Sequence, residues 1–140
     1  MAHDADLIPV VAVGGILGAL TRAEIDALIP HATGEWPWST FAINVLGAFV
    51  LGLLLQALLR VERRWVRPFA ITGILGGFTT FSALSMQTRD MLANGSGGLA
   101  LVYAVGSVIV GVGAVGLGIA LGRQLWPQSH GIEVSAVDEA

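Results

Sequence analysis

Residues 68–88 read PFAITGILGGFTTFSALSMQT, an uncharged and mostly apolar run that is long enough to cross a membrane as one helix. Two further uncharged runs of this kind occupy residues 40–59 and 98–122. A fourth, residues 7–21, is shorter and reaches full length only by continuing through the charged residues that follow it. The sequence therefore predicts an all-α membrane protein with one domain, residues 7–123, and four transmembrane helices at about 7–29, 39–59, 66–89 and 98–122.

The composition supports this fold class. Of the 140 residues, 54% are hydrophobic and 12% are charged, and the mean hydropathy is +0.76, whereas soluble domains carry about 25% charged residues. These values exclude a disordered chain and argue against an ordinary soluble enzyme. The chain has no cysteine, which excludes disulfide scaffolds, thiol redox chemistry and cysteine-bound zinc. No basic patch is large enough to predict a nucleic-acid partner.

The distribution of the seven basic residues, all arginine, predicts the orientation in the membrane. Only Arg22 and Arg89 fall near one side. Five fall on the side that also holds both termini, namely Arg60, Arg63, Arg64, Arg67 and Arg123. By the positive-inside rule, both termini and the middle connection are cytoplasmic, in a multi-pass protein of the cell inner membrane. We interpret the arginine cluster as this topology signal rather than as a lipid-binding site.

The two ends of the chain lie outside the predicted helices. The N-terminus lacks the positively charged region of a secretory signal peptide, so we expect the first apolar segment to remain in the protein. Residues 124–140 are polar and are expected to form a disordered tail.

Many of the 19 glycines lie inside the predicted crossings at helical spacing. Small residues four apart allow helix backbones to approach closely in lipid. The pairs at this spacing include Gly14 and Gly18, Gly73 and Gly77, and Gly118 and Gly122. The same packing role, rather than a ligand role, is expected for Gly111, Gly113, Gly116 and Gly118.

The centre of the third run, residues 76–82, has two adjacent glycines followed by two adjacent threonines, a pattern that favours a break in the helix. Broken backbone at membrane depth must be buried in protein or line a wet cavity, where its carbonyl groups can bind a cation. The alternative is a glycine kink whose main-chain groups are satisfied by the threonine hydroxyls. The residues leave both interpretations open.

Few polar groups interrupt the apolar runs. Asn44 offers two donors and one acceptor, and Tyr103 and Ser107 lie four apart on one face of the last helix. Taken singly, each is more often a hydrogen bond between helices than a ligand contact. Together with phenylalanine ring edges, which carry positive partial charge, neutral donors of this kind suit a small dehydrated anion. Arg22, near a membrane end, either raises the local anion concentration or only reaches toward the interface.

The chain resembles the CrcB/Fluc family of small fluoride channels across about residues 10–122. The resemblance rests on one stretch in each of the four crossings, in the same order: residues 14–22 (GGILGALTR), residues 40–47 (TFAINVLG), residues 73–82 (GILGGFTTFS), and Tyr103 with Ser107. It implies a fluoride-selective channel that exports fluoride passively from the cytoplasm and reduces its toxicity. The family further implies an antiparallel dual-topology dimer with two fluoride pathways and a sodium ion on the two-fold axis.

The resemblance also assigns roles to individual residues. The carbonyls of Gly76 and Thr79 would hold the sodium ion as a structural cofactor, and Arg22 would mark a vestibule or a structural contact. The fluoride path would be lined by Asn44, Phe81, Ser82, Tyr103 and Ser107.

Four positions depart from the family pattern. Leu84 replaces a phenylalanine, Ala83 a threonine, Gln87 an acidic residue, and Ala23 a tyrosine. Because leucine has no positive ring edge, a pathway that depends on position 84 should be impaired or lost. With the uneven arginine distribution, this leads to the hypothesis of an obligate heterodimer with an oppositely oriented paralogue.

Three other functions remain to be compared with this one. A small multidrug exporter would need a membrane carboxylate, and Glu24 is the only glutamate of the first helix. A non-conducting partner subunit differs from a channel only in whether Asn44 and Phe81 matter in this chain. An intramembrane hydrolase fails, because every histidine lies outside the crossings and a serine nucleophile would lack its base.

Overall fold

The computed structural model describes residues 5–127, apart from the side chain of residue 60. Residues 128–140 of the predicted tail therefore lie outside the described part. Within it, four helical segments are long and apolar enough to cross a membrane: Ala5–Leu28, Trp38–Ala57, Pro68–Ala93 and Gly97–Leu125. The predicted all-helical membrane fold with four crossings is confirmed.

Each crossing has its own helical composition. The first is a short 3₁₀ turn η1 (Ala5–Leu7) followed by α1 (Ile8–Leu28), and the second is α2 (Trp38–Ala57), followed by the 3₁₀ turn η2 (Leu58–Arg60). The fourth is the single long helix α5 (Gly97–Leu125). The third consists of a π-helical segment η3 (Pro68–Leu75), α3 (Gly76–Phe78) and α4 (Phe81–Ala93).

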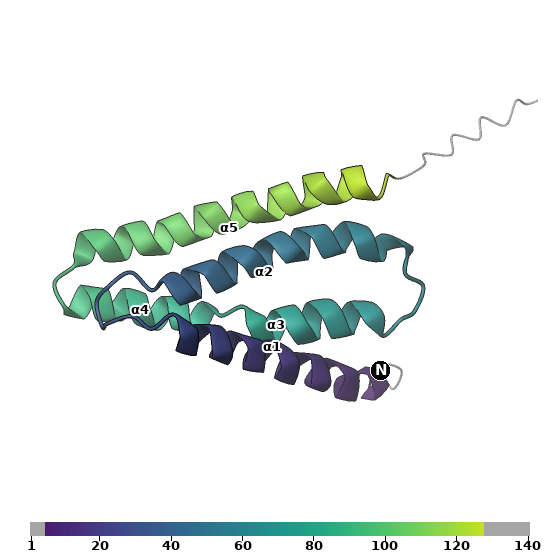
Figure 1. The fold of residues 1–140 in the computed structure, drawn as a ribbon, viewed down its shortest axis with the longest axis horizontal. Coiled ribbons are helices and arrows are strands. Elements are labelled where there is room, and N and C mark those ends of the chain that lie inside the picture. Colours follow the sequence, from purple (N-terminus) through teal and green to yellow (C-terminus); the bar gives the residue numbers. More distant parts are fainter. Residues whose placement is uncertain (1–4, 128–140) are drawn as a thin grey trace, which may run out of the picture.

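The four crossings run alongside one another, with α5 and α2 adjacent and with α1 beside the third crossing (Figure 1). α1 packs mainly on η3 and α3, whereas α4 packs on α5. The start of the chain, the connection after η2 and the end of α5 lie at one end of the bundle (Figure 1). An ion pair between Asp6 and Arg64 joins the first turn to that connection. The predicted placement of the middle connection beside the chain start is thus observed.

Glycines provide the closest helix contacts. A Cβ atom added at Gly14 would lie 2.6 Å from the carbonyl oxygen of Phe69, and one added at Gly18 would collide with the carbonyl of Ile74. On the other helix pair, an added Cβ at Gly118 would collide with the carbonyl of Phe49. The predicted role of glycine in close packing is confirmed at these positions, because only a residue without a side chain fits there.

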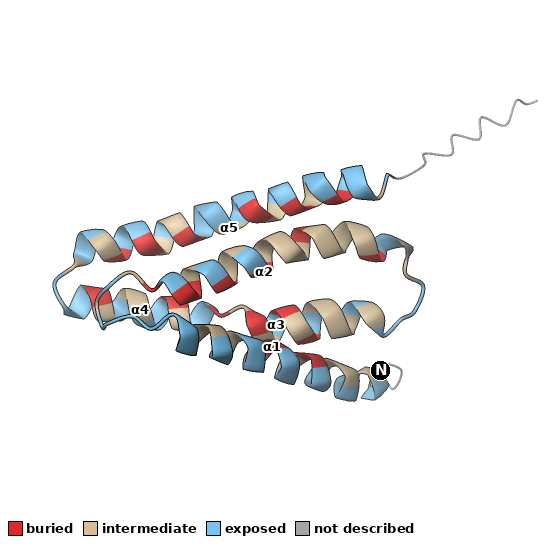
Figure 2. Cartoon of the chain, in the orientation of Figure 1, coloured by how far each residue is buried: buried red, intermediate tan, exposed pale blue. Residues whose placement is uncertain are grey.

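The described chain does not test the same prediction for three glycines of α5. A Cβ added at Gly111, Gly113 or Gly116 would meet no atom within 4 Å among the described residues. These glycines lie away from the α2 contact, on a helix whose outer face is largely exposed (Figure 2). The spacing of glycines in a sequence does not reveal which face of the helix has a neighbour.

Two residues with extended backbone separate α3 from α4. Thr79 has φ −79° and ψ 155°, and Thr80 has φ −147° and ψ 117°. The hydroxyl of Thr80 caps α4 by accepting a hydrogen bond from the amide of Ala83 at 3.1 Å. The hydroxyl and the amide of Thr79 both donate to the carbonyl of Leu75, each at 2.9 Å. The two threonines thus satisfy main-chain groups on both sides of the interruption.

Candidate anion-binding groove

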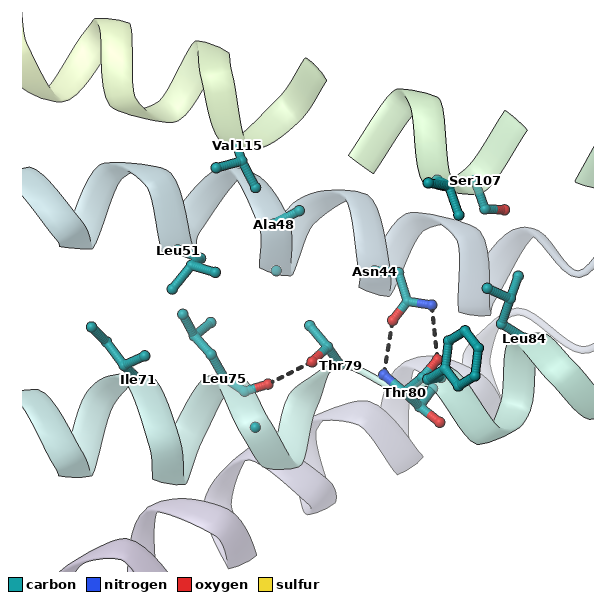
Figure 3. A pocket seen from close by; sticks show the side chains of 14 residues that line it. Asn44, Ala48, Leu51, Ile71, Leu75, Thr79, Thr80, Leu84, Ser107 and Val115 are labelled. Atoms are coloured by element: carbon teal, nitrogen blue, oxygen red, sulfur yellow. Dashed lines mark hydrogen bonds between the residues drawn. The ribbon is translucent and has the colours of Figure 1, made fainter. Parts of the chain in front are cut away.

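The interruption opens onto a groove of about 440 Å³ between α2, α5 and the third crossing (Figure 3). Most of its wall is apolar, and none of its lining residues carries a formal charge. The lining residues with polar side chains are Asn44, Thr79, Thr80 and Ser107. A cavity of this size, with few convergent polar groups, is the usual form of a ligand site.

Asn44 on α2 forms the main polar contact of the groove. Its side-chain Oδ1 accepts a hydrogen bond from the amide of Thr80 at 2.8 Å, and its Nδ2 donates to the carbonyl of Thr80 at 3.0 Å (Figure 3). An amide nitrogen carries two hydrogens, and the bond to Thr80 uses one of them. The predicted helix-to-helix bond of Asn44 is therefore observed, at the wall of the groove.

This contact changes the hydrogen bonding of the carbonyls before the interruption. In a continuous helix, the amide of Thr80 would bond to the carbonyl of Gly76, and the amide of Ala83 would bond to the carbonyl of Thr79. Here these amides donate instead to Asn44 Oδ1 and to Thr80 Oγ1. The carbonyls of Gly76 and Thr79 have thus lost their helical donors, and both residues line the groove.

Ser107 contributes a buried hydroxyl to the groove. The residue is only 8% exposed, and its Oγ has no hydrogen-bond partner among the described residues. A buried polar atom of this kind is costly unless a ligand or water satisfies it. Its position on the groove wall (Figure 3) makes it a candidate donor to a bound anion.

Phe81 and Ser82 follow the interruption at the start of α4. Phe81 lines the groove but remains 78% exposed, so the described chain leaves most of its ring uncovered. Ser82 is exposed and lies outside the groove lining, and its Oγ is 3.1 Å from the hydroxyl of Thr80. The structure therefore brings Phe81 to the groove with Asn44 and Ser107, and it places Ser82 beside them.

Tyr103 shares the buried face of α5 with Ser107 but is not part of the groove wall. It is fully buried, and its hydroxyl donates to Oε1 of Gln87 at 2.7 Å. Nε2 of Gln87 in turn donates to the hydroxyl of Thr40 at 2.8 Å and lies 3.5 Å from Nε2 of His31. Gln87 therefore connects α5, α2 and the connection between α1 and α2.

Three residues of this site escaped the sequence analysis as site residues: Thr40, Thr80 and Gln87. Gln87 was noted only because it departs from the family pattern. The available signal was a polar residue inside an apolar run, Thr40 in residues 40–59 and both Thr80 and Gln87 in residues 68–88, but the sequence does not show which of these residues meet.

Leu84 lies between the groove and the buried cluster. It lines the groove and also packs with Met91, Ala100 and Tyr103, and it is 8% exposed. The side chain at this position is therefore held by core packing on one side and faces the groove on the other. It presents an aliphatic surface, with no ring edge, to the groove.

Arg22 lies on α1, outside the groove lining. Its Nε donates to the carbonyl of Gly77 at 3.2 Å and so links α1 to α3. In a continuous helix that carbonyl would accept from the amide of Phe81. Of the two roles considered for Arg22, this contact favours the structural one.

The sequence pattern of the CrcB family, described as CrcB-like protein, Camphor Resistance, matches residues 9–119. This match includes most of each of the four crossings and every residue that lines the groove. The chain belongs to the CrcB family.

Relatives of this CrcB chain carry the name fluoride-specific ion channel. FluC 3 of Streptomyces avermitilis is 43% identical over 119 residues, which cover 84% of this chain but 58% of that relative. FluC 1 of Mycobacterium tuberculosis is 42% identical over 127 residues, covering 88% of this chain and 95% of that protein. FluC of Thermus thermophilus is 44% identical over 117 residues, covering 82% of this chain and 94% of that protein.

Proposed function

We propose that this CrcB chain is a fluoride-selective channel, or one subunit of such a channel, that lets fluoride leave the cytoplasm down its gradient. The names of its relatives support the ion, and the observation in the structure that carries the proposal is the uncharged groove with its neutral donors. A neutral donor replaces part of the water shell of an anion without trapping the ion as a buried arginine would. The function requires no covalent step, and the chain is not an enzyme.

Within this channel, Asn44, Phe81, Ser82, Tyr103 and Ser107 line the fluoride path. Asn44, Phe81 and Ser107 act at the groove itself. Tyr103 acts through a hydroxyl that Gln87 holds in place, so its contribution depends on that bond. The exporter alternative has no support in the groove, because Glu24 is exposed on α1 and lies outside the lining.

The experiment is fluoride efflux from liposomes that contain this chain reconstituted together with its partner chain, measured with a fluoride electrode, beside an identical measurement of chloride. The proposal expects rapid fluoride efflux and no chloride efflux. Equal transport of both ions would contradict selectivity. Efflux that Glu24→Gln abolishes and Asn44→Ala leaves intact would favour the exporter instead.

A second chain in antiparallel orientation completes the path. The exposed ring of Phe81 supports this assembly, because one chain covers only about a fifth of it. The open glycines of α5 also offer a surface for close helix packing. Cross-linking of a cysteine placed at Phe81 to its counterpart in the other chain tests the arrangement, and a monomeric channel would contradict it.

A sodium ion held by the carbonyls of Gly76 and Thr79 is the structural cofactor of this dimer. These carbonyls fit the ion, because sodium prefers neutral oxygen ligands of unwound helix backbone and both have lost their helical donors. Among the described residues, no cluster of histidine and acidic side chains offers another metal site. Replacing sodium by a large organic cation should lower the dimer's thermal stability if the site is occupied.

The partner is an oppositely oriented paralogue, and this chain sits in the inner membrane with both termini in the cytoplasm. The five arginines at one end support a single orientation. Leu84 supports a partner that supplies the missing phenylalanine. Robust efflux from this chain alone, through two conducting pathways, would contradict the heterodimer while leaving the fluoride channel intact.

A further inference from the structure

A second groove, of about 610 Å³, lies at the end of the bundle where the chain begins. Its walls come from η1 and α1 on one side and from the start of the third crossing on the other. The apolar residues that line it are Leu7, Pro9, Val10, Val13, Trp65 and Phe69. Because α1 and η3 belong to membrane-crossing segments, this apolar wall continues from the membrane end into the hydrocarbon region.

Among the described residues that line the groove, the charged ones are Asp6 and Arg64, which form an ion pair. Asp6 precedes α1 and Arg64 lies in the connection before η3, so the pair stands at the outer end of the groove. The groove is therefore apolar along the helices and charged at the end toward water.

Additional positive charge surrounds this end. Arg63 and Arg67 flank Arg64 in the same connection, and both are exposed. The turn that carries them is held by a bond of 3.1 Å from the amide of Val66 to the carbonyl of Arg63. Three guanidinium groups therefore stand beside the carboxylates of Asp6 and Glu62, and the surplus charge is positive.

Trp65 gives this end of the groove a residue composition that is typical of the membrane–water interface. Its ring packs edge-on against Phe69, with the ring centroids 6.4 Å apart, and remains 43% exposed. Tryptophan beside arginine is typical of the level of the lipid headgroups. The groove therefore offers an acyl-chain surface below an aromatic and cationic rim.

We propose that this groove binds an anionic phospholipid of the adjacent leaflet. One acyl chain lies along Val10, Val13 and Phe69, and the lipid phosphate is bound at the rim by the exposed guanidinium groups of Arg63 and Arg67. A guanidinium donates charge-assisted hydrogen bonds to phosphate oxygens, and Arg64, which is paired with Asp6, adds positive charge beside them. Charge complementarity selects an anionic lipid as the occupant, because the surplus positive charge at this end attracts a negatively charged headgroup.

From the sequence alone, the arginines are explained as a topology signal. The structure adds an apolar groove directly beside them, which the sequence does not reveal. Arginine near a membrane surface attracts anionic lipid by about 1 kcal/mol for each residue, which corresponds to about fivefold in affinity. The site does not depend on the proposed fluoride channel, because it lies outside the first groove.

The test is native mass spectrometry of the purified, delipidated protein titrated with palmitoyl-oleoyl-phosphatidylglycerol or with the corresponding phosphatidylcholine. We expect the anionic lipid to bind about fivefold more tightly than the zwitterionic one. Replacing Arg63 and Arg67 together by glutamine should remove most of this preference, whereas Arg89→Gln, at the other end of the bundle, should keep it. Equal binding of the two lipids, or the same loss in both variants, would overturn the proposal.

A second pair of variants tests the acyl-chain surface. Val13 is 53% exposed in the groove, and Leu20, on the same helix but outside the groove lining, is 59% exposed, so tryptophan is tolerated at both positions. Val13→Trp should fill the groove and weaken binding of both lipids, and Leu20→Trp should not. Unchanged binding in Val13→Trp would overturn the acyl-chain site. Glycerol phosphate that competes fully with the lipid would show that the site binds only phosphate, and a change in oligomeric mass in Val13→Trp would indicate a protein contact.

Discussion

Asn44 binds both main-chain polar groups of Thr80, accepting from its amide at 2.8 Å and donating to its carbonyl at 3.0 Å. One side chain on α2 thereby replaces helical partners that the backbone lacks where α3 ends. Buried main-chain groups must be paired, so the two hydrogen bonds of this side chain stabilise the extended conformation of Thr80 inside the protein. The residue that offers a donor to an anion is also the one that fixes the shape of the groove.

Replacing Asn44 by alanine should therefore impair both stability and transport. It leaves two main-chain groups of Thr80 unpaired, at a cost of about 1–3 kcal/mol for each group. We expect a lower melting temperature in detergent and fluoride efflux reduced by more than about tenfold. Ser85→Ala is the control, because the Ser85 hydroxyl is exposed and bonds only to the carbonyl of Phe81 within its own helix. Wild-type efflux from Asn44→Ala would contradict the role of this amide.

Replacing either of two neighbouring glycines of α1 by alanine should have different effects on the stability of the protein. In Gly14→Ala the new methyl group lies 2.6 Å from the carbonyl oxygen of Phe69, and the helices must separate. We expect a loss of about 1–3 kcal/mol, measured by thermal or denaturant unfolding in detergent. Gly15→Ala is the matched control, because its added Cβ meets nothing within 4 Å among the described residues. Equal loss of stability in both variants would contradict the close contact of α1 with η3.

Ser107→Ala should separate transport from stability. The hydroxyl has no partner among the described residues, so its removal relieves a buried unpaired group and should leave the protein as stable or about 1 kcal/mol more stable. Fluoride efflux should nevertheless fall, because the groove loses a donor. Thr21→Ala, which removes an exposed hydroxyl bonded to the carbonyl of Leu17, should change neither measurement. Unaltered fluoride efflux in Ser107→Ala would show that this hydroxyl is not used.

Tyr103 and Gln87 should show coupled energetics. Tyr103→Phe removes the donor to Gln87, and Gln87→Leu leaves the hydroxyls of both Tyr103 and Thr40 without this partner. We expect about 1 kcal/mol of destabilisation for the first variant and more for the second. Unfolding of both single variants and the double variant gives the coupling energy, which we expect to be about 1 kcal/mol. Strict additivity would mean that the bond contributes nothing to the fold.

The four crossings were predictable because their lengths and compositions suffice to identify them, but the end of the third crossing was less predictable. The sequence places the end of the third crossing near residue 89, where charged residues begin, whereas α4 continues to Ala93. The helix ends at Asn94 and Gly95, and Gly95 has φ +77°. The amide of Gly95 donates to the carbonyl of Leu92, and the amide of Ser96 donates to the carbonyl of Met91. This glycine-terminated motif is a stronger stop signal than a charge, which a helix tolerates where it meets water.

The groove was predictable only in part. Asn44 and Ser107 stand out because polar residues are rare in apolar runs, and the structure places both at the groove. The bond of Asn44 to Thr80 joins residues that are 36 positions apart, and helical periodicity carries no information about such contacts. For the same reason, the sequence does not predict the bond between Gln87 and Tyr103. It also does not predict which glycines of α5 face a neighbouring helix.

The 29 residues of α5 have a consequence for how the protein sits in a bilayer. At about 1.5 Å per residue the helix is roughly 43 Å long, whereas the hydrocarbon layer measures about 30 Å. The surplus forces α5 to lean from the bilayer normal or to project its final turns, with Arg123, into the headgroup region. The tilt angle of α5, and with it that of α2, which packs against it, should therefore vary with the acyl-chain length of the surrounding lipid.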